Sequence, residues 1–182
     1  MNNSSNRIFM QHDAILDLIQ GMARLTERHL QDREIEAPVM IGIHTGGVWV
    51  AERLHALLHI GQPLGQLDIS FYRDDFTRIG MNPQVKPSSI PFAVDDRHII
   101  LVDDVIQSGR TIRAAMNEIF DFGRPASITL VTLIERSGRE LPIQPDIIGL
   151  EPPLADEEHI RLQGPEPLNL AINGSRVNRE KT

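Results

Sequence analysis

Two carboxylates and a short hydroxyl-bearing turn lie close together near the middle of the chain. Asp103 and Asp104 follow an apolar run, and Ser108, Gly109 and Thr111 come a few positions later. Carboxylates accept hydrogen bonds from sugar hydroxyls and bind hydrated Mg²⁺. Hydroxyls and free backbone N–H groups at the start of a helix bind phosphate. Together, these two features predict a site for a phosphorylated ribose.

The flanking residues predict the elements that position this site. Residues 99–102 are all apolar, which is typical of a strand buried on both faces of a parallel sheet. Apolar residues recur with helical spacing directly after the turn, at Ile112, Ala115, Met116, Ile119 and Phe120. The polar residues therefore stand at the carboxyl end of a strand, where open α/β sheets bind ligands. The plainer alternative is an ordinary helix cap with solvated acids.

The two acids impose a condition on the backbone. Neighbouring residues in a regular strand face opposite sides of the sheet. Both carboxylates can therefore reach one ligand only if the chain leaves strand geometry at Asp104. The helix dipole contributes only about 0.3–1 kcal/mol to phosphate binding, so N–H and hydroxyl hydrogen bonds must supply most of the affinity.

A second segment repeats the layout of strand, loop and helix. Residues 38–43 predict another buried strand, and a helix is expected over 48–59. The loop between them, His44-Thr45-Gly46-Gly47, can offer backbone N–H groups to a second anion. The alternative is a plain glycine turn.

The rest of the chain predicts an alternating α/β order. Residues 8–9 indicate a short strand, and a helix from Asp13 as N-cap to 32 is expected to bury Ile15, Leu18, Ile19, Met22, Leu25 and Leu30. Further strands are predicted at 65–72, 127–134 and 147–149, with short edge strands within 150–172. The long irregular stretch 73–97 predicts a lid loop.

Composition narrows the class of protein. A chain of 182 residues fits one domain, residues 1–182, and has no apolar run near the roughly 20 residues that a membrane span needs. The polar start and the absence of cysteine favour a cytoplasmic protein with no disulfides. A net charge of −7 argues against a general nucleic-acid binder.

Residues 102–111 resemble the diphosphoribosyl-binding motif of type I phosphoribosyltransferases. The resemblance implies the fold of that superfamily: a central, mainly parallel twisted sheet flanked by helices, with a small hood at about 135–172. It implies that Asp103 and Asp104 are catalytic residues that hold the ribose hydroxyls of PRPP. It also implies that the 5′-phosphate is bound by the residues that follow them, Val105, Ile106, Gln107, Ser108, Gly109, Arg110 and Thr111.

The same resemblance assigns the diphosphate of PRPP to the second loop, at Thr45, Gly46 and Gly47. Many relatives have a lysine or arginine there, whereas this chain has His44 and Gly46, so backbone groups and residues from elsewhere must contribute. Arg73 is a candidate for contacting diphosphate or for structuring the base of the lid loop. Mg²⁺ is expected to be held mainly through PRPP, with Asp103 and Asp104 as candidate ligands.

Several longer segments resemble the PyrR family, notably 67–75, 99–113, 122–126 and 139–143. Members resemble phosphoribosyltransferases that convert uracil and PRPP to UMP and diphosphate, and they also regulate pyrimidine-biosynthesis genes. Purine-salvage relatives usually have an acid where this chain has Gln107, which cannot act as a general base. The base is expected near Arg136 and the segment 135–143 of the hood, with UMP or UTP as product or effector.

Three hypotheses follow from the resemblance. The first is a uracil phosphoribosyltransferase that also regulates genes, and the second is a mainly non-catalytic nucleotide sensor that binds leader mRNA. The acidic charge argues against the second, because RNA-binding members use a basic surface. The third is a different type I transferase, such as a purine enzyme. Relatives associate, so a homo-oligomer is expected.

Overall fold

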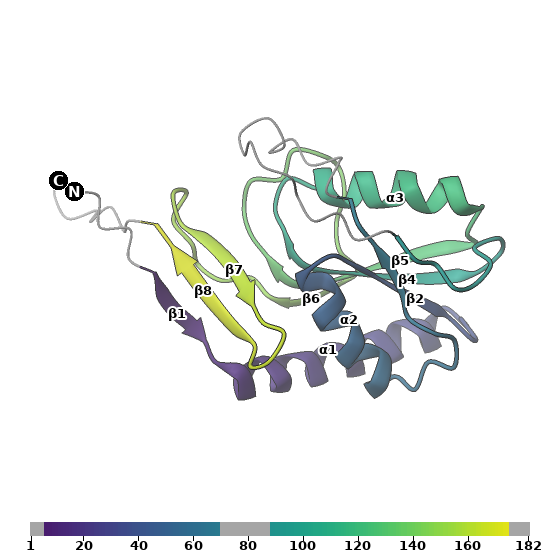
Figure 1. Cartoon of the computed structure of the whole chain (residues 1–182), viewed down its shortest axis with the longest axis horizontal. Coiled ribbons are helices and arrows are strands. Elements are labelled where there is room, and N and C mark those ends of the chain that lie inside the picture. The colour runs from purple at the N-terminus through teal and green to yellow at the C-terminus, as the bar shows by residue number, and fades with distance from the viewer. Residues whose placement is uncertain (1–5, 70–87, 175–182) are drawn as a thin grey trace, which may run out of the picture.

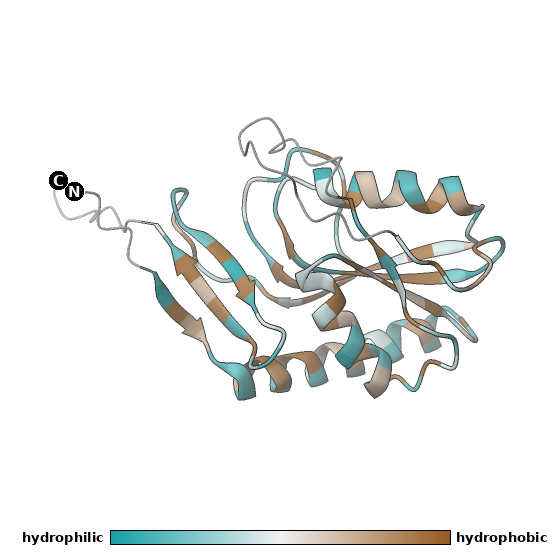
Figure 2. Cartoon of the chain, viewed as in Figure 1, coloured by the Kyte–Doolittle hydropathy of each residue, from teal (hydrophilic) through white to brown (hydrophobic). Residues whose placement is uncertain are grey.

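The fold is taken from a computed structural model that describes residues 6–69 and 88–174. Its centre is a five-stranded sheet in the order β3-β2-β4-β5-β6, in which every neighbouring pair is parallel. The strands are β2 (Val39–Ile43), β3 (Gly65–Leu67), β4 (His98–Ile106), β5 (Ser127–Glu135) and β6 (Ile147–Leu150). Strands β2, β4 and β5 are rich in apolar residues, which are brown in Figure 2, and most of these residues are buried.

Helices cover both faces of this sheet (Figure 1). Helices α1 (His12–Asp32) and α2 (Gly46–Leu57) pack on one face, and α3 (Arg110–Phe122) packs on the other. Alternate residues of β4 enter the two resulting cores: Ile100 and Val102 pack with α1 and α2, and Ile99 and Leu101 pack with α3. This arrangement confirms the predicted α/β architecture with a mainly parallel sheet.

A second sheet brings the two ends of the described chain together. Strands β1 (Arg7–Met10), β8 (Asn169–Asn173) and β7 (His159–Gln163) pair antiparallel in the order β1-β8-β7. The apolar runs within 150–172 therefore pair with each other and with β1, and not with the edge of the main sheet. The predicted hood at 135–172 is divided between the sheets, because β6 belongs to the main one.

Several predicted boundaries were wrong. Gln11 precedes α1 as N-cap and Asp13 lies in its first turn. Leu25 is 49% exposed, whereas Ala23 and Thr26 are buried. The face of α1 that packs on the core therefore includes Ala23 and Thr26 and leaves Leu25 outside it. Helix α2 begins at Gly46, two residues earlier than predicted. Strand β4 continues through both acids to Ile106 because it stays paired with β5.

The predicted lid loop is described only in part. Residues 73–87, and with them Arg73, lie outside the described residues, as does the end of the strand predicted at 65–72. The described portion, 88–97, is packed onto the domain: Ser89 pairs with Gln66 in an isolated bridge, and Val94 is 3% exposed. Within the described ranges, no helix is long and apolar enough to cross a membrane.

The two faces of α1 predict different responses to truncation. Ile19 is 1% exposed in the core, so Ile19→Ala is expected to lower the free energy of unfolding by about 2–5 kcal/mol. Leu25 lies on the same helix but is half exposed, so Leu25→Ala is expected to change that free energy by less than about 1 kcal/mol. Urea unfolding measures both variants, and equal losses would contradict this packing.

Candidate active site

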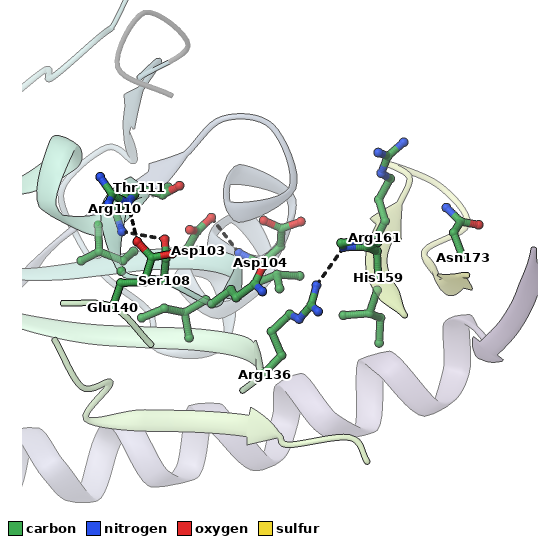
Figure 3. A pocket seen from close by; sticks show the side chains of 16 residues that line it. Asp103, Asp104, Ser108, Arg110, Thr111, Arg136, Glu140, His159, Arg161 and Asn173 are labelled. Atoms are coloured by element: carbon green, nitrogen blue, oxygen red, sulfur yellow. Dashed lines mark hydrogen bonds and ion pairs between the residues drawn. The ribbon is translucent and has the colours of Figure 1, made fainter. Parts of the chain in front are cut away.

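A cavity of about 570 Å³ lies at the carboxyl end of β4, between the main sheet and the second sheet. One wall is continuous in sequence: residues 103–112, from the end of β4 to the start of α3. The other wall comes from distant segments and contains Arg136, His159, Ile160, Arg161 and Asn173, while Glu140 lies beside the first wall, next to Ser108 and Arg110 (Figure 3). Figure 3 shows the two walls facing each other. The cavity therefore forms only when β7 and β8 pack beside the carboxyl end of β4.

Both acids lie against the first turn of α2. An added Cβ at Gly46 would stand 2.3 Å from Oδ2 of Asp104, and one at Gly47 would stand 3.2 Å from Oδ1 of Asp103. The backbone N–H of Asp104 donates to Oδ1 of Asp103 at 2.9 Å, which draws the two residues together. In a regular strand their side chains would point to opposite faces. Figure 3 shows both carboxylates on the same side.

The side chains of β4 therefore stop alternating between the two faces at the acids, although the strand does not end there. Asp103 pairs with Thr132 and Val105 pairs with Ile134, so the ladder to β5 continues past both acids. The prediction that the chain leaves strand geometry at Asp104 was wrong about the pairing. The condition behind that prediction, that both carboxylates can reach one ligand, is nevertheless met, because both lie on the α2 side. Asp103 is 1% exposed and Asp104 is partly buried, so the acids combine a fixed and a more accessible carboxylate.

The turn at 107–111, here called the phosphate loop after the ligand that the resemblance predicts for it, overlaps the first residues of α3. Gly109 is the N-cap of this helix and has φ +90°, in the left-handed region that favours glycine. The hydroxyl of Ser108 accepts the backbone N–H of Arg110 at 3.2 Å. The loop thus ends on the first turn of a helix, where backbone N–H groups lack intrahelical partners.

A segment from beyond β5 holds the phosphate loop in place. The backbone N–H groups of Glu140 and Leu141 both donate to the carbonyl of Ser108 at 3.0 Å. The guanidinium of Arg139 donates to the carbonyl of Gln107 at 3.0 Å and also pairs with Glu135. Because these bonds use carbonyl oxygens, they leave the N–H side of the loop available for an anion.

Glu140 also brings a carboxylate to the rim of the cavity. Its Oε2 is 2.7 Å from Nε of Arg110, and both side chains are more than half exposed. An exposed ion pair of this kind contributes about 0–1 kcal/mol, so a bound phosphate can compete for Arg110 at little cost.

The second loop stands behind the acids. Residues 45–47 are absent from the lining of the cavity, while Gly46 and Gly47 support the two carboxylates from the α2 side. His44 is held by two contacts: its backbone N–H donates to the carbonyl of Leu67 at 2.8 Å, and its Nε2 lies 3.0 Å from Oε1 of Gln66. The glycines of this loop therefore have a packing role as well as any role toward diphosphate.

Arg136, at the end of β5, is the buried cation of the opposite wall. It is 6% exposed, and burial lowers the pKa of its guanidinium below the ordinary range for arginine. Nη2 donates to the carbonyl of Glu158 at 2.9 Å, and Nη1 lies 3.1 Å from Nδ1 of His159. The carboxylate of Glu158 in turn pairs with Arg7 at 2.8 Å. These contacts join β5, β7 and β1 beside the cavity.

The structure brings most of the predicted site residues to one place. Residues 103–111 and Arg136 line the cavity, while the second loop contacts it only through the acids. Sequence reasoning missed His159, Arg161 and Asn173, and it included Glu140 only as part of the segment 135–143 expected near the base. On β7, His159 and Arg161 are polar residues that alternate with the buried Ile160 and Leu162, and that alternation is the one signal that marked them.

Comparison with known proteins gives the class first. The phosphoribosyl transferase domain family matches residues 11–163, so the chain belongs to the phosphoribosyltransferases. It is more closely similar to proteins named bifunctional protein PyrR. It is 59% identical to the one from Nitrosococcus oceani over 157 residues, covering 85% of this chain and 89% of that protein. The Pseudomonas paraeruginosa protein is 56% identical over 154 residues, covering 85% and 91%. The chain is a member of the PyrR family.

Solved structures confirm the type I phosphoribosyltransferase fold. The hypoxanthine phosphoribosyltransferase of Trypanosoma cruzi matches with a TM-score of 0.67 and 15% identity, covering 92% of this chain and 96% of that one. A hypoxanthine-guanine phosphoribosyltransferase from Bacillus anthracis matches with a TM-score of 0.64 and 19% identity, covering 81% and 84%. At these identities the likeness concerns the fold and carries no information about the base.

The contact between Gly46 and Asp104 predicts a sharp effect of one methyl group. In Gly46→Ala the new Cβ would overlap the Asp104 carboxylate and displace it, so transferase kcat/KM for PRPP is expected to fall about 100-fold. Gly61→Ala is the matched control, because no atom lies within 4 Å of its Cβ position. Circular dichroism checks that both variants fold, and a fully active Gly46→Ala enzyme would contradict the packing.

Proposed function

We propose that the chain transfers the 5-phosphoribosyl group of PRPP to uracil, forming UMP and diphosphate, and that it also regulates pyrimidine-biosynthesis genes. One observation carries the proposal: the paired acids and the phosphate loop share one cavity, in a chain more than half identical to bifunctional PyrR proteins. A nucleotide needs such a pairing, because its ribose and its 5′-phosphate are covalently joined.

Each part of the cavity has a role in this proposal. Asp103 and Asp104 accept hydrogen bonds from the ribose hydroxyls, and residues 107–111 donate N–H and hydroxyl groups to the 5′-phosphate. Thr45, Gly46 and Gly47 assist the diphosphate through backbone groups. Arg136 lies across the cavity from the acids, where the base would project. Arg73, which lies outside the described residues, is proposed to contact diphosphate or to structure the base of the lid loop.

Magnesium fits this set of residues as a metal carried by the substrate. Among the described residues, no three histidine or acidic side chains form a group that could hold a metal alone. Mg²⁺ typically keeps one or two protein carboxylates and takes its other ligands from substrate phosphates and water. Asp103 and Asp104 offer such carboxylates. When bound, the ion supplies positive charge that offsets the charge of the departing diphosphate.

The reaction requires one substitution at the anomeric carbon. The bond from C1 of ribose to a diphosphate oxygen breaks, a bond from C1 to N1 of uracil forms, and the N1 proton passes to water or a diphosphate oxygen. Purine-salvage relatives usually have a carboxylate at the position of Gln107, where it could act as a general base. The amide of Gln107 cannot take this proton. Catalysis therefore comes from positioning and from stabilising separated charge.

The regulatory role is proposed to use leader mRNA as partner and UMP or UTP as effector, in a homo-oligomer. The word "bifunctional" in the names of the relatives supports a second activity. The net charge of −7 means that RNA contacts must gather on a local basic surface. The chain is proposed to act in the cytoplasm.

Replacing both acids tests the proposed catalytic site. Asp103→Asn with Asp104→Asn is expected to abolish UMP formation from uracil and PRPP, because neutral amides lose the charge-assisted bonds to the ribose hydroxyls. Asp95→Asn with Asp96→Asn is the matched control, since that pair lies outside the cavity lining. Undiminished turnover in the double Asn variant at 103 and 104 would exclude this site.

Base selection separates the proposed enzyme from other type I transferases. With Mg²⁺ and PRPP fixed, uracil is expected to be used at least about 100-fold better than hypoxanthine or orotate, measured as kcat/KM. A preference for hypoxanthine would instead identify a purine enzyme.

RNA binding is tested by filter binding over a salt series. A specific site that neutralises several phosphates of leader RNA is expected to give a slope of about −0.7 per contact in a plot of log affinity against log salt. UMP should change that affinity, and scrambled RNA of the same length is the control. Equal, weak binding of both RNAs would exclude the regulatory role through RNA.

A further inference from the structure

His159 lies on the wall of the cavity that faces the acids and has no role in the proposal above. It begins β7, and its exposed ring lines the cavity together with Arg136. Figure 3 shows the ring beside the guanidinium of Arg136, across from Asp103 and Asp104. A nucleotide held by its phosphate and ribose on the first wall would direct its base toward this pair.

The contact with Arg136 determines where the imidazole carries its proton. Nδ1 of His159 is 3.1 Å from Nη1 of Arg136. A guanidinium nitrogen can only donate a hydrogen bond, so Nδ1 must accept with its lone pair. The proton of the neutral ring is then on Nε2. A doubly protonated ring would set N–H against N–H and one positive charge against another.

Arg136 is fixed firmly enough to impose this choice. Arg136 is 6% exposed, and its Nη2 donates to the carbonyl of Glu158, the residue directly before His159. The carboxylate of Glu158 is itself held by Arg7 at 2.8 Å and accepts the backbone N–H of Ala155 at 3.0 Å. The acceptor side of the ring is thus occupied by a buried, anchored cation.

The other ring nitrogen is left for a ligand. Within the described residues, Nε2 of His159 has no hydrogen-bond partner, while the ring as a whole is exposed at the cavity. A single N–H donor at this position suits a carbonyl oxygen of the base. Uracil has two ring carbonyls, whereas adenine has none.

We propose that His159 is a base-binding residue that donates a hydrogen bond from Nε2 to a ring carbonyl of the pyrimidine, in the tautomer set by Arg136. The inference rests on the proposed function for the identity of the base. It makes Arg136 a positioning residue, acting on the base through His159.

Ligand binding tests the contact independently of turnover. His159→Asn keeps an acceptor for Arg136 but lacks the distal donor, and it is expected to weaken UMP binding about tenfold in calorimetry. Binding of ribose 5-phosphate, which lacks the base, should be unchanged. His159→Gln, whose amide reaches farther, should recover most of the affinity for UMP. His55→Asn, outside the cavity, is the matched control.

The tautomer is tested by ¹⁵N NMR of the imidazole nitrogens, with the His159 signals assigned by their loss in His159→Gln. An unprotonated Nδ1 and a protonated Nε2 at neutral pH are expected in the wild type, and Arg136→Met should remove this preference. A proton on Nδ1, or UMP affinity unchanged in His159→Asn, would overturn the inference. If the wild type makes no UMP but these binding and NMR results hold, the enzymatic proposal fails and this inference stands.

Discussion

The close approach of β4 to the start of α2 determines how this site is built. Two adjacent acids in a paired strand would normally face opposite sides of the sheet. Here both carboxylates lie against Gly46 and Gly47, at positions where any Cβ would overlap them or their backbone. The glycines therefore have a packing role toward the acids, whatever they contribute to ligand binding.

A second constraint acts on the phosphate loop. The loop presents N–H groups to an anion only if its carbonyl groups are satisfied elsewhere. Residues 139–141 supply the donors: two of their backbone N–H groups donate to the carbonyl of Ser108, and the guanidinium of Arg139 donates to the carbonyl of Gln107. The segment after β5 thus organises a loop more than 25 positions earlier in the chain, because β4 and β5 are neighbours in the sheet.

The second sheet adds a facing wall to the cavity at the carboxyl end of β4. Its three strands come from both ends of the chain, and the buried contacts of Arg136 and Glu158 attach it to β5. Removing one partner of such a buried network leaves another charged group without compensation, which is costly. The wall that faces the acids is therefore set by the same interactions that hold the two sheets together.

Local sequence was sufficient for the first wall of the cavity. Apolar residues at 99–102, the acids, the turn at 107–111 and the helix after it follow one another directly, so their arrangement depends on short-range geometry. The same reasoning predicted the buried strand at 38–43 and the helix after it. It also predicted the parallel α/β sheet, since alternating strands and helices leave few other topologies.

Tertiary structure alone decided the second wall. His159, Arg161 and Asn173 are ordinary polar residues in short strands, and only the pairing of β8 with β1 and β7 carries them to the cavity. The exposure of Leu25 and the register of the acids were likewise set by packing against neighbouring elements. Local patterns report which residues prefer burial or a turn, but contacts between segments far apart in the chain depend on the whole fold.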